Sequence, residues 1–185
     1  MVSTASISNW AGNVTFGATL VHRPTSMDQL RSLVAAGTRC RALGTGHSFS
    51  TVADTSGDLV SVADMPRRIE IDRTSATVTV NSGLRFGELA PVLHAEGLAL
   101  HNLGSLPHIS VAGACATGTH GSGDRNGCLA TAVRAVEMVT ADGDLLRIDE
   151  SDASFAGVPV SLGTLGIISA LTLSVQPAYG MRQHV

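Results

Sequence analysis

The sequence predicts an α+β fold, in which helices and strands follow one another without a regular alternation. Two segments carry apolar residues at helical spacing, and several others show the alternation or the short apolar runs of strands. The order of these segments is mixed, which argues against a regular βαβ winding. With 185 residues, 44% of them hydrophobic, the chain is long enough for one large domain or two small lobes that share a core.

Local signals set the ends of the predicted elements. A helix is expected over residues 26–36, because Ser26 and Gln29 have the spacing of a capping box and Gly37 suits the C-terminal cap. A second helix is expected over residues 86–96, which carry one apolar stripe and end at a glycine. The predicted strands are 39–43, 59–62, 69–71, 76–80, 133–140, 145–148 and 167–175.

Polar turns connect two pairs of these strands, and the chain divides into two predicted lobes. Residues 72–75 and 141–144 read as hairpin turns, so Asp142 and Asp144 are interpreted as solvated turn residues. A soft boundary falls near residues 73–83. Lobe one then covers about 10–75 and lobe two about 76–178, each with one glycine-rich segment.

The charged residues exclude several classes of protein. All twelve basic residues are arginine, so the chain offers no lysine for a Walker-A phosphate loop or for a pyridoxal-phosphate Schiff base. A net charge of -3 without a basic run gives no sign of nucleic-acid binding.

The cysteines and the apolar segments indicate the cellular compartment of the protein. Cys40, Cys115 and Cys128 have no C-x-x-C spacing, and we expect three reduced thiols in a cytoplasmic protein rather than a zinc site. Residues 1–11 lack the apolar core of a signal peptide, and no stretch is long and apolar enough to span a bilayer. No membrane partner is therefore expected.

The most informative segment is the first glycine-rich loop, Ala42-Leu-Gly-Thr-Gly-His-Ser-Phe-Ser50. Glycines let the backbone approach a ligand closely, and successive N–H groups can form a concave site for an anion such as a diphosphate. The loop is not a Rossmann fingerprint, because Phe49 stands where the third glycine is needed. An ordinary tight turn is the alternative.

A histidine inside this loop favours a cofactor. His47 is open to three interpretations: an exposed turn residue, a metal ligand, or a nucleophilic imidazole linked to a cofactor. We favour the last.

A second glycine-rich segment runs from Ser105 to Gly123. Its small residues would let a flat ring system or a diphosphate lie against the backbone, and its hydroxyl groups could donate hydrogen bonds. The alternative is a tightly packed loop whose buried histidines bond to backbone carbonyls.

A metal site at His101, His108 and His120 is disfavoured, because the spacing of these histidines matches no compact zinc pattern. A Ser–His–Asp hydrolase is disfavoured because the chain has no G-x-S-x-G elbow.

Six ordered motifs together resemble the FAD-binding domain of the vanillyl-alcohol oxidase family. The likeness runs from Asn9 to Tyr179, and within the family it is strongest to alditol oxidases, including xylitol oxidase, and next to sugar-lactone oxidases. The motifs are Arg23-Pro24, the helix at Ser26, Gly44-Thr-Gly-His-Ser-Phe49, Ser105-Leu-Pro-His-Ile-Ser-Val-Ala-Gly113, Ala116-Thr-Gly-Thr-His-Gly-Ser122 and Ser161-Leu-Gly-Thr-Leu-Gly166.

The resemblance implies a two-lobed, PCMH-type fold that holds FAD between the lobes. His47 would be bonded to the flavin 8α-methyl carbon, and Ser105 would lie beside the flavin and near the substrate. The other residues implied to contact the cofactor are Gly44, Thr45, Gly46, Ser48, Phe49, Ser110, Gly113, Thr117, Gly118, Thr119, His120, Gly166 and Ile167.

The resemblance also implies an activity: oxidation of the terminal CH–OH of an alditol by oxygen, giving an aldose and hydrogen peroxide. The catalytic base and the polyol-binding side chains would belong to a C-terminal substrate domain that this sequence does not include, so no catalytic residue is assigned and the segment alone is expected to be inactive. The alternatives are a sugar-lactone oxidase, a flavin-binding module without turnover, and a chain that needs a partner or a dimer to hold FAD.

Overall fold

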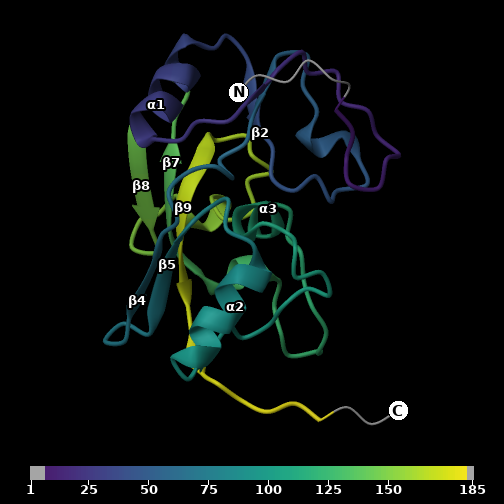
Figure 1. Cartoon of the computed structure of the whole chain (residues 1–185). Coiled ribbons are helices and arrows are strands. Elements are labelled where there is room, and N and C mark those ends of the chain that lie inside the picture. The colour runs from purple at the N-terminus through teal and green to yellow at the C-terminus, as the bar shows by residue number, and fades with distance from the viewer. Residues whose placement is uncertain (1–6, 183–185) are drawn as a thin grey trace.

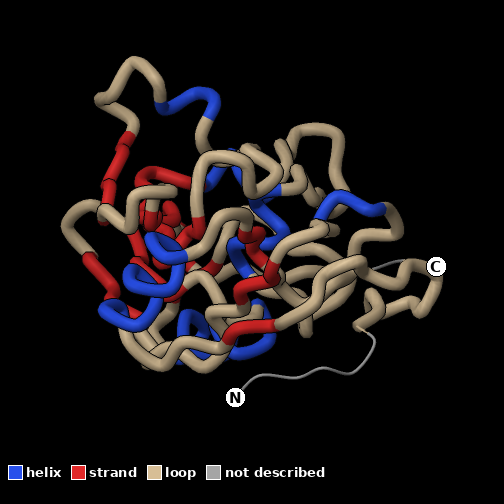
Figure 2. Tube along the Cα trace, turned by 90° about the horizontal axis from the view of Figure 1, so that it is seen from above, coloured by secondary structure: helices blue, strands red, loops and turns tan. Residues whose placement is uncertain are grey.

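A computed structural model of the chain describes residues 7–182 (Figure 1). It contains helices and two main sheets in mixed order, so the α+β prediction is confirmed. Seen from above, long stretches of loop connect these elements (Figure 2). Within the described residues no helix is long and apolar enough to cross a membrane.

The smaller sheet is parallel and has the order β1-β3-β2, with β1 at Val21–His22, β2 at Cys40–Ala42 and β3 at Asp58–Val60. Helix α1, Met27–Ala36, begins as predicted, because Ser26 Oγ accepts a hydrogen bond from the Gln29 N–H at 3.2 Å. Leu30 and Val34 of α1 pack with residues of both sheets in one buried cluster. This helix therefore joins the two halves of the molecule.

The larger sheet is antiparallel and has the order β4-β5-β9-β7-β8. Its strands are β4 at Ile69–Asp72, β5 at Thr77–Asn81, β7 at Val133–Val139, β8 at Leu145–Asp149 and β9 at Ile167–Ser174. Because β4 pairs with β5, residues 69–72 lie in the larger sheet. The change of sheet therefore falls between Val60 and Ile69, whereas the soft lobe boundary is predicted near residues 73–83.

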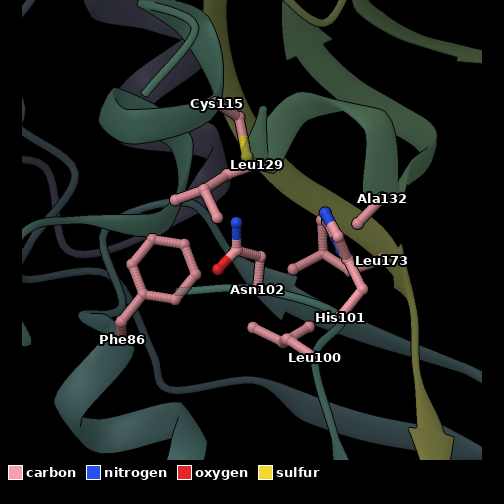
Figure 3. A pocket seen from close by; sticks show the side chains of 8 residues that line it. All are labelled: Phe86, Leu100, His101, Asn102, Cys115, Leu129, Ala132 and Leu173. Atoms are coloured by element: carbon pink, nitrogen blue, oxygen red, sulfur yellow. The ribbon is translucent and has the colours of Figure 1, made fainter. Parts of the chain in front are cut away.

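One face of the larger sheet carries the main core. Helix α2, Phe86–Ala95, and the short helix α3, Val111–Ala116, pack here, with Leu89 and Leu93 fully buried. The packing is tight: the cavity beside Cys115 has a volume of only about 10 Å³, which is room for about one water, and Figure 3 draws the side chains that line it.

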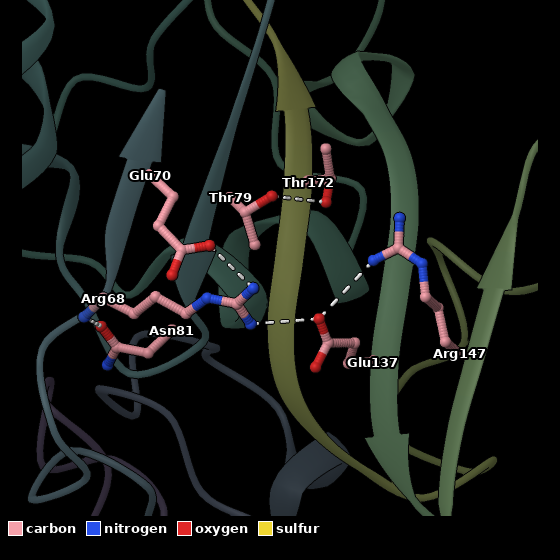
Figure 4. Close-up of polar contacts among 7 residues, drawn as sticks. All are labelled: Arg68, Glu70, Thr79, Asn81, Glu137, Arg147 and Thr172. Carbon is pink, nitrogen blue, oxygen red and sulfur yellow. Dashed lines mark hydrogen bonds and ion pairs between the residues drawn. The ribbon is translucent and has the colours of Figure 1, made fainter. Parts of the chain in front are cut away.

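Polar side chains close the opposite face of the sheet (Figure 4). Arg68 bonds to Glu70 at 2.9 Å and to Glu137 at 3.1 Å, and Arg147 approaches Glu137 at 3.5 Å. The hydroxyls of Thr79 and Thr172 pair at 2.9 Å. The alternation along these strands thus separates an apolar face from a charged one.

The sequence did not indicate α3 or the shortest elements. These are β1, β6 at Leu98–Ala99, β10 at Gln176–Pro177, and 3₁₀ turns at Thr51–Ala53, Leu129–Ala132 and Phe155–Gly157. Elements this short show no usable periodicity, and tertiary packing holds them.

Candidate functional site: a cleft between two glycine-rich segments

A cleft of about 780 Å³ brings together segments that are far apart in the chain. Residues of β2, of the first glycine-rich loop, of α3 and of the start of β9 line it. Its volume is within the range of small-molecule and cofactor sites. The predicted site residues that line it are Gly44, Thr45, Gly46, His47, Ser48, Ser110, Gly113, Thr117, Thr119, Gly166 and Ile167.

The two glycine-rich segments meet around one serine. A Cβ placed on Gly44 or on Gly113 would lie 2.7 Å from Ser110 Oγ, so glycine at both positions leaves room for this hydroxyl where it stands. The Ser110 N–H donates to Thr45 Oγ1 at 3.2 Å, which ties the segments together. Ser110 Oγ is buried and has no hydrogen-bond partner. The cleft therefore holds an unsatisfied hydroxyl between two stretches of closely approaching backbone.

His47 presents a second unsatisfied group. Its Nδ1 shares a hydrogen bond with Thr45 Oγ1 at 2.9 Å, whereas its Nε2 is buried without a partner. Burial, the neighbouring His108 and the Arg85 guanidinium lower the pKa of His47. The imidazole is therefore held in its neutral form, which is the nucleophilic one.

Two aromatic rings pack against His47. Trp10 stacks on it with ring centroids 5.0 Å apart and an interplanar angle of 21°, and the His108 ring lies 4.6 Å away. The backbone N–H of Trp10 donates to the Gly46 carbonyl at 2.8 Å, which holds this part of the chain beside the loop. His108 Nε2 is also buried without a partner, which differs from the alternative of buried histidines satisfied by carbonyls.

The charged side chains that line the cleft are Arg23, Arg41 and Arg85, and no carboxylate is among the described lining residues. Arg41 donates to the Val52 carbonyl at 2.7 Å and to the Leu162 carbonyl at 2.9 Å. Its guanidinium thereby connects β2 with the segment before β9. This lining favours an anionic ligand.

Sequence reasoning missed Trp10, Arg41 and Arg85 as cleft residues. Only the position of Arg41, just before the glycine-rich loop, could have drawn attention to it.

Four of the predicted contact residues do not line the cleft. Phe49 is 69% exposed, and the side chains of Ser105 and His120 are also exposed. His120 Nδ1 bonds to the carbonyl of the next residue at 2.9 Å. Gly118, with φ +65°, turns the chain at the end of α3 instead of facing the cleft. Within residues 7–182, no three His, Cys, Asp or Glu side chains converge as a metal site would require.

Comparison with known proteins agrees with this geometry. Residues 18–149 match the FAD binding domain family. The chain is 49% identical to an alditol oxidase of Streptomyces sp., over 100% of this chain and 45% of that protein. It is 36% identical to an L-gulono-1,4-lactone dehydrogenase of Mycobacterium tuberculosis, over 96% of this chain and 42% of the relative. It is 34% identical to an L-gulonolactone oxidase of Mus musculus, over 92% of this chain and 40% of that protein.

The chain thus spans less than half of the length of each of these relatives. The family match covers most of the chain and includes both glycine-rich segments that form the cleft. This chain therefore belongs to the FAD-binding domain family.

Proposed function

We propose that this chain is the FAD-binding part of a flavoprotein oxidase that converts the terminal CH–OH of alditols such as xylitol and sorbitol to the aldose, with oxygen as acceptor and hydrogen peroxide as product. The observation that carries this proposal is the 49% identity to an alditol oxidase over the whole chain. The alditol and oxygen are the proposed small-molecule partners.

The cleft has the features that FAD requires. The backbone around Gly44 and Gly46 offers close approach to a diphosphate, and the charged groups among the described lining residues are all cationic. The proposal is supported by Ser110 Oγ, which is buried without a partner among the described residues and would bond to the cofactor. When bound, FAD would accept a hydride from the carbinol carbon and pass the electrons to oxygen.

We also propose that FAD is attached covalently through His47. The supporting observations are that this imidazole lines the cleft, is kept neutral, and leaves its buried Nε2 without a partner. A neutral imidazole nitrogen can act as a nucleophile toward the flavin 8α carbon.

Spectroscopy of purified protein tests the covalent link. We expect flavin absorption bands in the near-ultraviolet and blue, and flavin fluorescence that stays with the protein after acid precipitation. His47→Ala should lose the acid-stable flavin and keep reversibly bound FAD. His94→Ala, which changes an exposed histidine at the end of α2, should behave as wild type. Acid-stable flavin in His47→Ala would refute this attachment site.

An assay that identifies the substrate class requires a longer protein that also contains the proposed substrate domain. The relatives named for lactone substrates make a sugar-lactone oxidase the alternative. Oxygen consumption with xylitol, sorbitol and L-gulono-1,4-lactone would separate the two activities. Faster turnover of the lactone than of either alditol would reject our proposal in favour of the alternative.

A further inference from the structure

His108 lines the cleft, and its ring lies against the ring of His47. The proposed function gives His108 no role. Their ring centroids are 4.6 Å apart and their planes meet at 52°. His108 reaches this position from the segment just before α3, whereas His47 belongs to the first glycine-rich loop. Both Nε2 atoms are buried and neither has a hydrogen-bond partner. Two protonatable rings therefore lie side by side in the cleft.

Among the described residues around this pair, Thr45 and the face of the Trp10 ring favour a positive charge on His47, whereas Arg85 and a protonated His108 oppose it. Trp10 contacts both rings, with centroids 5.0 Å from His47 and 5.8 Å from His108, and it carries no charge. Thr45 offers His47 a neutral hydroxyl. Arg85 adds a second positive group that disfavours protonation of His47, and no carboxylate is among the described residues that line the cleft. Two positive charges on rings with centroids 4.6 Å apart repel each other, so a charge on His108 disfavours protonation of His47.

We infer that His108 is a positioning residue that keeps the His47 imidazole neutral by lying against it as a second protonatable ring. The inference rests on the proposed function, because a neutral His47 is the form that can be attached to FAD. In that attachment an imidazole N–H bond and a C8α–H bond break and an N–C8α bond forms. The two protons and two electrons pass to oxygen, which leaves as hydrogen peroxide. His108 thereby lowers the pH above which attachment proceeds.

The first test needs no cofactor, because the single tryptophan of the chain lies on His47. A protonated imidazole quenches indole fluorescence, so Trp10 emission against pH reports the protonation of His47. Loss of the transition in His47→Gln assigns it. In His108→Gln and in His108→Phe, which keeps a ring against Trp10, the midpoint should rise by about half to one pH unit. His94→Gln, far along α2, is the matched control and should leave the midpoint unchanged.

The second test follows attachment itself. The 185-residue chain is incubated with FAD and oxygen at a series of pH values, and intact mass gives the flavin-bearing fraction. The pH midpoint for attachment should rise in both His108 variants by the same amount as the Trp10 midpoint. A Trp10 midpoint that is unchanged or lower in both His108 variants overturns the inference. If no variant, wild type included, attaches FAD, the proposed covalent link fails, and the Trp10 titration alone still decides whether His108 acts on His47.

Discussion

Ser110 joins the two glycine-rich segments and faces the cleft with a hydroxyl that no described group satisfies. Its N–H bonds to Thr45, and its Oγ lies 2.7 Å from the position that a Cβ on Gly44 or Gly113 would take. A buried hydroxyl without a partner destabilises a fold, so its presence indicates that something else bonds to it. The serine therefore has opposite effects on stability and on ligand binding.

This gives a prediction of opposite signs for Ser110→Ala. Without FAD, the free energy of unfolding should stay the same or rise by up to about 1 kcal/mol, because an unsatisfied group is removed. FAD affinity should weaken by about tenfold to a hundredfold, as expected for a lost bond to a charged group. Urea unfolding and a fluorescence titration, the latter in the His47→Ala background where binding is reversible, measure the two effects.

Ser82→Ala is the matched control. Ser82 also lines the cleft, but its Oγ donates to the Ile168 carbonyl at 2.6 Å. Its loss should lower the free energy of unfolding by about 1–2 kcal/mol, because a buried carbonyl loses its donor. If Ser110→Ala bound FAD as tightly as the protein with Ser110, the serine would not contribute to FAD binding.

At the scale of elements, α3 shows what local pattern can and cannot predict. The alternation of Val78 and Val80 with polar residues marks β5 correctly, because every second side chain enters the core. Helix α3, in contrast, consists of six mostly small residues and was interpreted as part of a loop. Its helical form comes from packing against the larger sheet, which the sequence does not display locally.

Cys115 tests how firmly α3 is packed. Burial, and secondly the nearby Cys128, raises the pKa of Cys115 to about 12, and burial with Asp58 raises the pKa of Cys40. Since the thiolate is the reactive form, Ellman's reagent at about pH 8 should modify the half-buried Cys128 first, Cys40 more slowly, and Cys115 only upon unfolding. Peptide mapping by mass spectrometry gives the order. Equal rates at Cys115 and Cys128 would mean that α3 opens readily.

At the scale of the whole molecule, the cleft depends on contacts between distant segments. The bond from Arg41 Nη2 to the Leu162 carbonyl joins residues 121 positions apart. Glycine-rich loops could be recognised as candidate sites because glycine itself marks close approach. The partners that complete the cleft, such as Trp10 and Arg85, carry no comparable local signal, so their proximity emerges only from the fold.

Arg41→Met tests this connection. The variant removes the hydrogen bonds to the Val52 and Leu162 carbonyls, and should lower the free energy of unfolding by about 1–3 kcal/mol. Amide hydrogen exchange should also accelerate in residues 161–166. The control Arg39→Met removes only an exposed bond to Ser56 and should change stability by less than about 0.5 kcal/mol. Equal effects of the two substitutions would show that Arg41 does not connect the segments.

The pH dependence of stability is a property of many carboxylates together. The hydrogen bond from His22 is the largest cause that lowers the pKa of Asp58, and Thr19 adds to it. The pKa values of four more carboxylates are lowered by local hydrogen bonds: Glu70, Asp72, Asp149 and Asp152. A carboxyl group whose pKa is lower in the folded state than in the unfolded state stabilises the fold at pH values above its ordinary pKa. That stabilisation is lost as pH falls through the range.

The free energy of unfolding should therefore decline on acidification from about pH 5 to about pH 3. In His22→Leu the decline should be shallower, because Asp58 loses the bond that lowers its pKa, while the other carboxylates keep a residual slope. His94→Leu should retain the wild-type slope, since that histidine lies outside the pair. Urea unfolding at a series of pH values measures all three. An equally steep decline in His22→Leu would show that the 2.8 Å contact between His22 and Asp58 does not persist in solution. The pair would then not stabilise the small parallel sheet, although it joins the neighbouring strands β1 and β3.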